Sequence, residues 1–216
     1  MKTLNQYILI LMLLLMPVVA TACSHSSNES QPETAAPAAV EAPKLPPMPS
    51  QPTGSAFIVV SKRDMTLSVY DRNSAGDTIM AAQFPCCMGK NKGDKMKRGD
   101  MRTPESPAGR PFKITMIQDA SKWHHDFKDG RGSILAYGHW FLRLATPGHK
   151  GIGIHGSTNN ESTVPSRASE GCIRLLDKDI ITLKEHFAYV GMPVTVLHED
   201  QAPLSWELRA RQATAK

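Results

Sequence analysis

Short apolar runs, separated by glycine, proline and charged residues, recur along the chain from about residue 57 to residue 197. They are rich in β-branched and aromatic residues, which is typical of strands. The runs are 57-FIVVS-61, 66-TLSVYD-71, 78-TIMAAQFPCCMG-89, 111-PFKITMI-117, 152-IGIHG-156 and 193-PVTVL-197. A chain of many short strands buries its core between sheets, so we expect a mostly β fold, a sandwich or a barrel.

One late segment has a helical pattern instead. In 177-DKDIITLKEHFAYVG-191, Asp177 or Asp179 can cap the N-terminus and Gly191 can end the helix. One face of this helix would carry Ile180, Leu183, Lys184 and Phe187. The third apolar run, by contrast, contains Pro85, so we expect that strand to be interrupted or to end there.

The first 22 residues have the layout of a secretory signal peptide: a lysine, an apolar run and then small residues. The run is short for a membrane-spanning helix, which needs about 20 residues. Residues 20-ATAC-23 resemble the processing box of bacterial lipoproteins, which implies that Cys23 is acylated and anchors the chain to a membrane. Ser24 fits an outer-membrane destination. The alternative is ordinary cleavage near Ala22, which would leave Cys23 as a free thiol.

Three further segments follow the expected signal peptide. Residues 23–54 are rich in proline, alanine and serine and nearly lack large apolar residues, so we expect a disordered tether. Residues 55–200 have the composition and length of one globular domain. Residues 201–216 contain a few apolar residues and a basic end, and we expect a short docked segment with a frayed tail. The whole arrangement predicts an exported protein of the cell envelope, in the periplasm.

The net charge of the chain is +5 at pH 7. A modest basic excess is compatible with an anionic polymer as the partner. The chain has no block of lysine and arginine interleaved with aromatic residues, so we expect no nucleic acid partner. We also expect a monomer that uses no cofactor.

Cys172 is the residue with the most open assignment. It could be half of a disulfide with Cys86 or Cys87, a small buried hydrophobic residue, a metal ligand or a nucleophile. A zinc site could draw on His124, His125, His139, His149 and Cys172, but the usual ligand spacings are absent. Cys86 and Cys87 themselves are expected to be small buried strand residues.

A histidine precedes this cysteine at a distance that a folded loop can close. Cys172 follows His155 by 17 positions (172 − 155). A cysteine needs a base to become a thiolate at neutral pH, and histidine has a suitable pKa. The spacing alone leaves the four assignments of Cys172 open.

Several motifs in the same order resemble the L,D-transpeptidases, the YkuD-like family. The active-site signature of that family is similar to 152-IGIHGS-157 together with 169-SEGCIRL-175. Four further segments resemble family segments: 89-GKNKGDK-95, 99-GDMRTPES-106, 137-YGHWFLRL-144 and 189-YVGMPVTV-196. The resemblance runs through nearly the whole domain and implies a β-sandwich or barrel of the L,D-transpeptidase type.

The resemblance implies a role for each residue of the signature. Cys172 would be the nucleophile and His155 the general base and proton donor, with the Gly156 carbonyl or Ser157 orienting the imidazole. The backbone N–H groups of Gly171 and Cys172 would form an oxyanion hole.

Four other residues would shape the oxyanion hole or the substrate site: Tyr137, Ser169, Glu170 and Arg174. Arg174 would hold a substrate carboxylate, or else form an ion pair with Asp177 or Asp179. Glu170 departs from the family, which usually has a histidine two positions before the cysteine. A carboxylate there would tend to raise the pKa of the thiol, unless it turns away to a cationic substrate group or to Arg174.

The implied substrate is the peptidoglycan stem peptide. A stem tetrapeptide would acylate Cys172 with loss of D-Ala, and the amine of a second stem would then form a 3→3 cross-link. Carbapenems would acylate the same cysteine. Water as the acceptor would give an L,D-carboxypeptidase, and other relatives attach or release wall proteins. A non-catalytic cell-wall binding module is a further alternative, supported only by Glu170. The loop over residues 119–134 could form a lid over the cleft.

Overall fold

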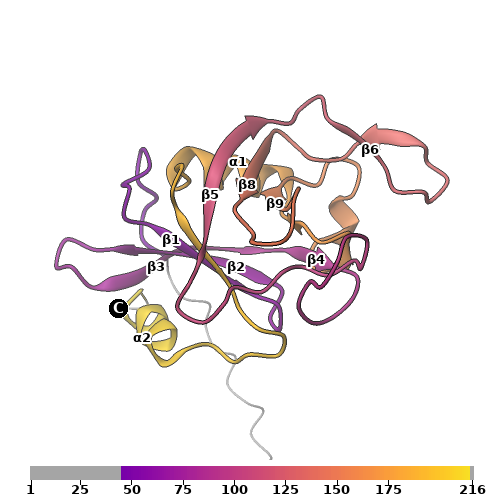
Figure 1. Ribbon diagram of the computed structural model, residues 1–216. Coiled ribbons are helices and arrows are strands. Elements are labelled where there is room, and N and C mark those ends of the chain that lie inside the picture. The colour runs from indigo at the N-terminus through magenta and orange to yellow at the C-terminus, as the bar shows by residue number, and fades with distance from the viewer. Residues whose placement is uncertain (1–44, 215–216) are drawn as a thin grey trace, which may run out of the picture. The chain divides into compact units, whose positions relative to one another are not determined.

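The computed structural model describes residues 45–214, which form a mostly β domain with two helices (Figure 1). The expected signal peptide, Cys23 and most of the expected tether lie outside the described residues. The first strands are β1 (Phe57–Ser61), β2 (Thr66–Arg72), β3 (Thr78–Pro85), β4 (Cys87–Gly89), β5 (Phe112–Asp119) and β6 (His124–Asp126). The later ones are β7 (Ser133–Leu135), β8 (Trp140–Leu144), β9 (Gly153–His155), β10 (Ser166–Ser169), β11 (Ile173–Arg174) and β12 (Pro193–Val196). The prediction of a mostly β fold is confirmed, as is the interruption at Pro85.

Ten of these strands form one continuous sheet in the order β10-β4-β11-β9-β8-β5-β12-β1-β2-β3. Strand β5 joins the two halves of this sheet, because it pairs with β12 on one side and with β8 on the other. Strands β6 and β7 form a separate antiparallel hairpin, which projects from the domain (Figure 1). The parallel neighbours β9 and β11 bring together two segments that are well separated in the sequence.

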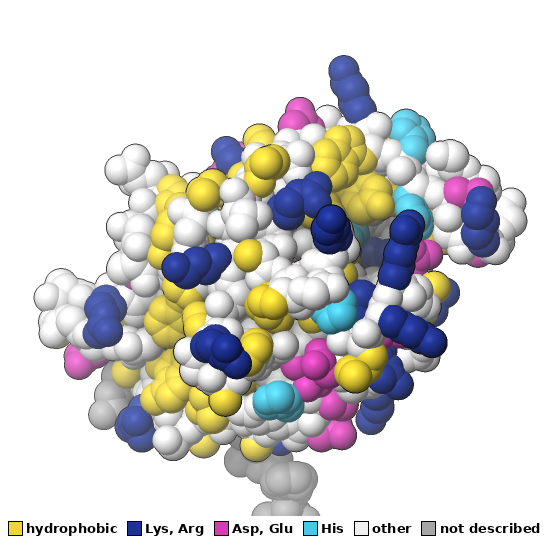
Figure 2. Space-filling view, in the orientation of Figure 1, with side chains coloured by type: hydrophobic (Ala, Val, Ile, Leu, Met, Phe, Trp, Pro, Cys, Tyr) yellow, Lys and Arg dark blue, Asp and Glu magenta, His cyan; other side chains and the backbone are white. Residues whose placement is uncertain are grey.

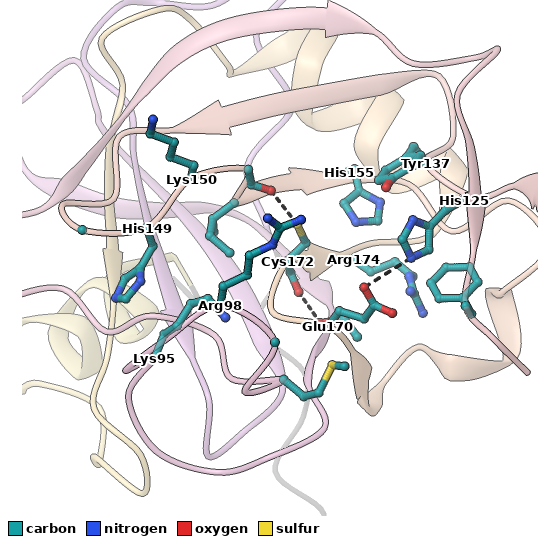
Figure 3. Close-up of a pocket in the computed structure, with 17 residues that line it drawn as sticks. Lys95, Arg98, His125, Tyr137, His149, Lys150, His155, Glu170, Cys172 and Arg174 are labelled. Carbon is teal, nitrogen blue, oxygen red and sulfur yellow. Dashed lines mark hydrogen bonds and ion pairs between the residues drawn. The ribbon is translucent and has the colours of Figure 1, made fainter.

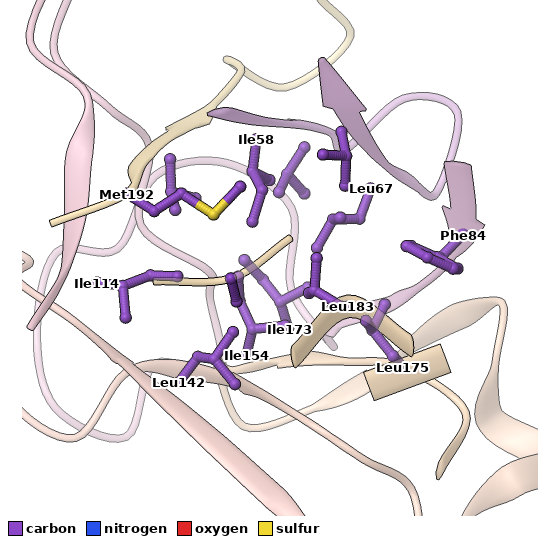
Figure 4. Packing of buried hydrophobic residues seen from close by; sticks show 14 of the residues in the cluster. Ile58, Leu67, Phe84, Ile114, Leu142, Ile154, Ile173, Leu175, Leu183 and Met192 are labelled. Carbon is purple, nitrogen blue, oxygen red and sulfur yellow. The ribbon is translucent and has the colours of Figure 1, made fainter. Parts of the chain in front are cut away.

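Both halves of the sheet contribute to one hydrophobic core (Figure 4). Leu67 comes from one half, Ile154 and Ile173 come from the other, and all three side chains are fully buried. Burying a side chain of this size stabilises the fold by about 1.5–3 kcal/mol. The core therefore holds β9 and β11 in a fixed register, and these strands carry the candidate catalytic residues.

Helix α1 (Asp177–His186) is the expected helix, but it is shorter than the segment 177–191. Ile180 and Leu183 are buried, and the helix lies against β8 and β9, so the apolar face is confirmed. The predicted aspartate cap is wrong, because the N-cap residue is Leu176 and makes no side-chain capping bond. The Asp177 carboxylate is engaged by another loop, described below.

A second helix, α2 (Ser205–Thr214), forms where the sequence suggested only a docked segment and a frayed tail. Trp206 packs on Phe57 and Tyr70, with ring centroids 5.6 and 5.0 Å away, and Ala210 is buried beside them. Helix α2 thus contacts β3 and covers the outer face of the β1–β3 part of the sheet. Its inward residues include only two apolar ones, so the apolar periodicity that indicates a helix is weak.

Residues 45–54 are the part of the expected tether that the structure describes, and they contain no helix or strand. The Thr53 hydroxyl donates to the Asp71 carboxylate over 2.8 Å, and the Pro49 carbonyl lies 2.7 Å from His186 Nδ1. These contacts place the end of the segment along the domain. Neither helix of the described residues has the length and apolar character needed to cross a bilayer.

Candidate active site

A pocket of about 720 Å³ opens where β9 ends and β11 begins. His155 is the last residue of β9, and it pairs in register with Arg174 of β11. Cys172 immediately precedes β11 and lines the same pocket. The side chains of His155, Cys172, Tyr137 and Arg174 all face this space (Figure 3). The register of two parallel strands therefore brings the thiol and the imidazole to one site.

The His155 imidazole is held rigidly and is neutral. Its Nδ1 lies 2.7 Å from the Gly156 carbonyl, and its ring stacks on Phe141 with centroids 5.7 Å apart. A carbonyl can only accept a hydrogen bond, so Nδ1 carries the proton and Nε2 is free to accept one. Burial lowers the pKa of His155 to about 3, and the positive charge of Arg174 acts in the same direction. The residue is therefore a neutral base across the physiological range.

The Cys172 thiol is partly buried and donates to the Gly151 carbonyl over 3.4 Å. Burial raises the pKa of this thiol above its ordinary value, and the nearby Glu170 carboxylate acts in the same direction. The resting pair is therefore a neutral thiol and a neutral imidazole. Such a pair suits proton transfer during attack, by general base catalysis.

Ser169 fixes the turn that carries the nucleophile. Its hydroxyl donates to the Cys172 carbonyl over 2.6 Å and accepts from the Gly171 N–H over 3.1 Å. Gly171 has φ +135°, and a Cβ there would lie 2.7 Å from the Arg102 carbonyl oxygen. This position thus requires glycine, both for its backbone conformation and for the close approach of the neighbouring loop.

The expected oxyanion hole needs a correction. The Gly171 N–H is engaged by Ser169, so it is not free to bind an oxyanion. The Cys172 N–H and the Tyr137 hydroxyl make no hydrogen bond within residues 45–214, and Tyr137 also lines the pocket. These two groups are the remaining candidate donors.

Arg174 is almost fully buried at the base of the pocket. Its Nη1 donates to the Thr163 hydroxyl over 2.8 Å, and its guanidinium lies 5.5 Å from the centroid of the Phe127 ring. It forms no ion pair with Asp177 or Asp179, so that alternative is wrong. A role in binding a substrate carboxylate stays a prediction.

Asp177 organises the loop after His155, a role that the sequence did not reveal. Its carboxylate accepts from the backbone N–H groups of Ser157 and Thr158 over 2.6 and 3.1 Å, and from the Thr158 hydroxyl. Gly138 and Gly156 leave room for this carboxylate, because a Cβ on either residue would meet Asp177 Oδ1. The Gly156 carbonyl, which contacts His155, is thereby fixed in place.

Ser157 was the alternative to Gly156 as the group that orients His155. Its hydroxyl is fully buried and makes no hydrogen bond to any residue that the structure describes. The Gly156 carbonyl alone therefore contacts the imidazole Nδ1 among the described residues.

The β6–β7 hairpin forms one wall of the pocket through His125 and Phe127. His125 Nε2 lies 3.2 Å from a carboxylate oxygen of Glu170, a contact that Figure 3 marks. The expectation that Glu170 turns to Arg174 is wrong, since its ionic partner is His125. The hairpin spans residues 124–135. It therefore coincides with most of the segment 119–134, which the sequence suggested as a lid, and ends one residue beyond it.

The opposite wall is basic. It is lined by Lys95, Arg98, His149 and Lys150, which Figure 3 shows across the pocket from His125. Figure 2 shows further lysine and arginine side chains on this face of the molecule. Lys95 is paired with Asp100 at 2.7 Å. Arg98 and Lys150 are exposed and have no acidic partner within residues 45–214. No local sequence pattern indicates this wall, because its residues come from two separate loops.

The structure also shows the state of Cys86 and Cys87 and the arrangement of the candidate zinc ligands. Cys86 and Cys87 are free and fully buried, as expected, and neither is bonded to Cys172 in this structure. Only Cys87 is a strand residue, because Cys86 lies between β3 and β4. Within residues 45–214, no three His, Cys, Asp or Glu side chains are grouped as metal ligands would be.

Comparison with protein families decides what kind of domain this is. The family described as YkuD, L,D-transpeptidase catalytic domain, matches residues 55–196, which is more than half of the chain. The chain belongs to the L,D-transpeptidase family. That family is a cysteine-type family that acts on peptidoglycan stem peptides.

No curated protein matches the chain. Several solved structures are similar to it. Bdellovibrio bacteriovorus Bd1075 has 20% identity and a TM-score of 0.48, over 79% of this chain and 59% of that one. The helical cell shape determining protein Pgp2 from Campylobacter jejuni has 20% identity and a TM-score of 0.47, over 73% and 52%. An L,D-transpeptidase from Mycobacterium smegmatis has 20% identity and a TM-score of 0.43, over 68% and 59%. The match thus spans just over half of each of those chains.

Proposed function

We propose that this protein is a peptidoglycan L,D-transpeptidase that uses Cys172 as its nucleophile. The observation that carries the proposal is the placement of a thiol and a neutral imidazole, with Nε2 free, in one pocket. The substrate would be a stem tetrapeptide, and the product a 3→3 cross-link between two stems.

In the first half-reaction, the Cys172 thiol gives its proton to His155 Nε2 as the sulfur attacks the carbonyl before the terminal D-Ala. A C–S bond forms, the C–N bond to D-Ala breaks, and the imidazolium returns the proton to the leaving amine. The Cys172 N–H and the Tyr137 hydroxyl are the donors proposed for the oxyanion.

In the second half-reaction, the side-chain amine of another stem attacks the thioester. A C–N bond forms, the C–S bond breaks, and the sulfur recovers a proton through His155. Positioned acid–base groups contribute about 10²–10⁴-fold to such steps.

The basic wall supports a substrate with several carboxylates. Arg98 and Lys150 have no acidic partner among the described residues, and Arg174 lies buried at the base. Stem peptides carry free carboxylates, which guanidinium and ammonium groups bind well. We also propose that the chain is anchored through an acylated Cys23 and that residues 23–54 let the domain reach the wall from the membrane.

The test is to incubate the purified protein with a disaccharide tetrapeptide and to identify the products by mass spectrometry. Release of D-Ala together with a cross-linked dimer supports the proposal. Tripeptide without any dimer would instead indicate an L,D-carboxypeptidase. Unreacted tetrapeptide with the wild type as well as with Cys172→Ala would indicate a non-catalytic binding module.

A further inference from the structure

Glu170 is the one carboxylate among the described residues that line the pocket. It lies two positions before Cys172, and its side chain is 41% exposed. The other ionisable groups that line the pocket are lysine, arginine, histidine, tyrosine and the Cys172 thiol. The negative charge of Glu170 is unusual in this pocket, because the other charged residues that line it are basic and would bind anions.

Among residues 45–214, the Glu170 carboxylate has no lysine or arginine as its ionic partner. Its ionic contact is His125 Nε2 at 3.2 Å, and this histidine is charged only when it is protonated. Arg174 lines the same pocket, but it bonds to the Thr163 hydroxyl and lies over Phe127. By contrast, Lys95 on the opposite wall is paired closely with Asp100. Glu170 is therefore available to bind a cation that enters the pocket.

This charge is unfavourable for the first half-reaction. Burial is the main cause of the raised pKa of the Cys172 thiol, and the Glu170 carboxylate makes a smaller contribution in the same direction, so it opposes formation of a thiolate. The donor brings carboxylates to the site, and Glu170 would repel them. The second half-reaction is different, because an amine acceptor is an ammonium ion in water at neutral pH.

We propose that Glu170 binds the ammonium group of the acyl acceptor and selects amines over water. This inference rests on the proposed function and specifies its second half-reaction. The ammonium displaces His125 as the partner of Glu170 and gives one proton to the carboxylate, which passes it to solvent. The neutral amine attacks the thioester, the C–N bond forms as the C–S bond breaks, and the second amine proton reaches the Cys172 sulfur through His155.

The test compares Glu170→Gln with the wild type in two separate assays. The first measures the rate of acylation by a carbapenem through intact mass. The second forms the thioester from a tetrapeptide donor and measures its transfer to D-methionine, which has an ammonium group, and to hydroxylamine, which is neutral at neutral pH. The ratio of the two transfer products reports the preference for a cation.

We expect Glu170→Gln to acylate at least as fast as the wild type. The ratio of D-methionine product to hydroxylamine product should fall about 10- to 100-fold, the factor that corresponds to one hydrogen bond to a charged group. Glu170→Asp keeps a carboxylate and should retain a preference for D-methionine. His125→Gln is the matched control, because it removes the partner of Glu170 and keeps the charge, so it should retain the ratio.

An unchanged ratio in Glu170→Gln would overturn the inference and leave the transpeptidase proposal intact. A parallel loss of acylation and of both transfers would also overturn it, because that result indicates a structural role. Failure of the wild type to form any thioester would instead overturn the proposed function itself.

Discussion

The floor and the rim of the pocket are built in different ways. The floor consists of His155, Cys172 and Arg174, which lie on or beside the parallel strands β9 and β11 and are held by the core. The rim carries exposed charges on loops and on a hairpin, such as Lys150 and Glu170. From this difference we expect the strand register to determine the positions of the catalytic side chains, whereas the loops determine which substrates bind. Changes in the floor should therefore alter rates far more than changes in the rim.

The largest expected effect comes from removing the base in the floor. His155→Gln keeps a donor for the Gly156 carbonyl but cannot accept a proton from the thiol. Acylation by a carbapenem should slow by about 10²–10⁴-fold, which is the usual contribution of general base catalysis. The rate of adduct formation by intact mass measures this. A rate within a few fold of the wild type, with unchanged thermal stability, would remove His155 from the mechanism.

The pH dependence of thiol alkylation tests the charge state of the floor. Burial raises the pKa of Cys172 and lowers that of His155 to about 3, so the pair is neutral near pH 7. The thiolate population therefore rises with pH, and the rate of iodoacetamide alkylation should increase about tenfold per unit from pH 6 to 9. A plateau that begins below pH 7 would indicate a thiolate–imidazolium pair and contradict this account.

Substitution of Asp177 tests whether the position of His155 depends on the hydrogen bonds that hold the loop after it. Asp177→Ala removes the acceptor for the Ser157 and Thr158 N–H groups, and a hydrogen bond to a charged group contributes about 1.5–3 kcal/mol. The free energy of unfolding should fall by at least about 2 kcal/mol, and acylation should slow about tenfold because the Gly156 carbonyl is no longer fixed.

Asp177→Asn is the matched control, since its amide oxygen can still accept from Ser157. It should lie between the wild type and Asp177→Ala in both urea denaturation and acylation rate. Equal acylation in all three proteins would show that the loop does not position His155.

A substitution in the rim should act on binding alone. Lys150→Gln should raise KM for the tetrapeptide donor by up to about fivefold, since an exposed charge pair contributes about 0.2–1 kcal/mol. The effect should shrink at high salt because exposed charges are screened. Steady-state release of D-Ala at two ionic strengths measures it. A large fall in kcat with unchanged KM would contradict the separation of floor and rim.

Helix α2 should have the smallest effect on the chemistry, because it covers the opposite part of the sheet (Figure 1). Trp206→Ala should lower the free energy of unfolding by about 3 kcal/mol, since it removes the contacts with Phe57 and Tyr70. Carbapenem acylation of the folded protein should not change. A slower acylation at a temperature where the variant remains folded would link α2 to the site.

The features that are local in sequence were predictable. The β-branched runs gave the main strands, and Ile180 and Leu183 gave the apolar face of α1, because a strand or helix period is visible within a few residues. The signature around His155 and Cys172 identified these two residues of the floor. Helix α2 was missed because Trp206 and Ala210 are its only apolar residues that pack inward, so the segment shows little apolar periodicity.

The features that depend on long-range contacts were not predictable. Asp177 was read as a helix cap, but the close approach of Gly138 and Gly156 redirects its carboxylate to the Ser157 loop. The contact between His125 and Glu170 joins a hairpin to the nucleophile turn, and no local pattern indicates it.

The central claim is that Cys172 becomes covalently acylated, and the intact mass of the protein after carbapenem exposure tests it most directly. We expect the wild type to gain the mass of one carbapenem and Cys172→Ala to gain none. The variant retains Cys23, Cys86 and Cys87, so the comparison isolates the Cys172 thiol. An adduct of equal yield on Cys172→Ala, or no adduct on the wild type, would contradict the account.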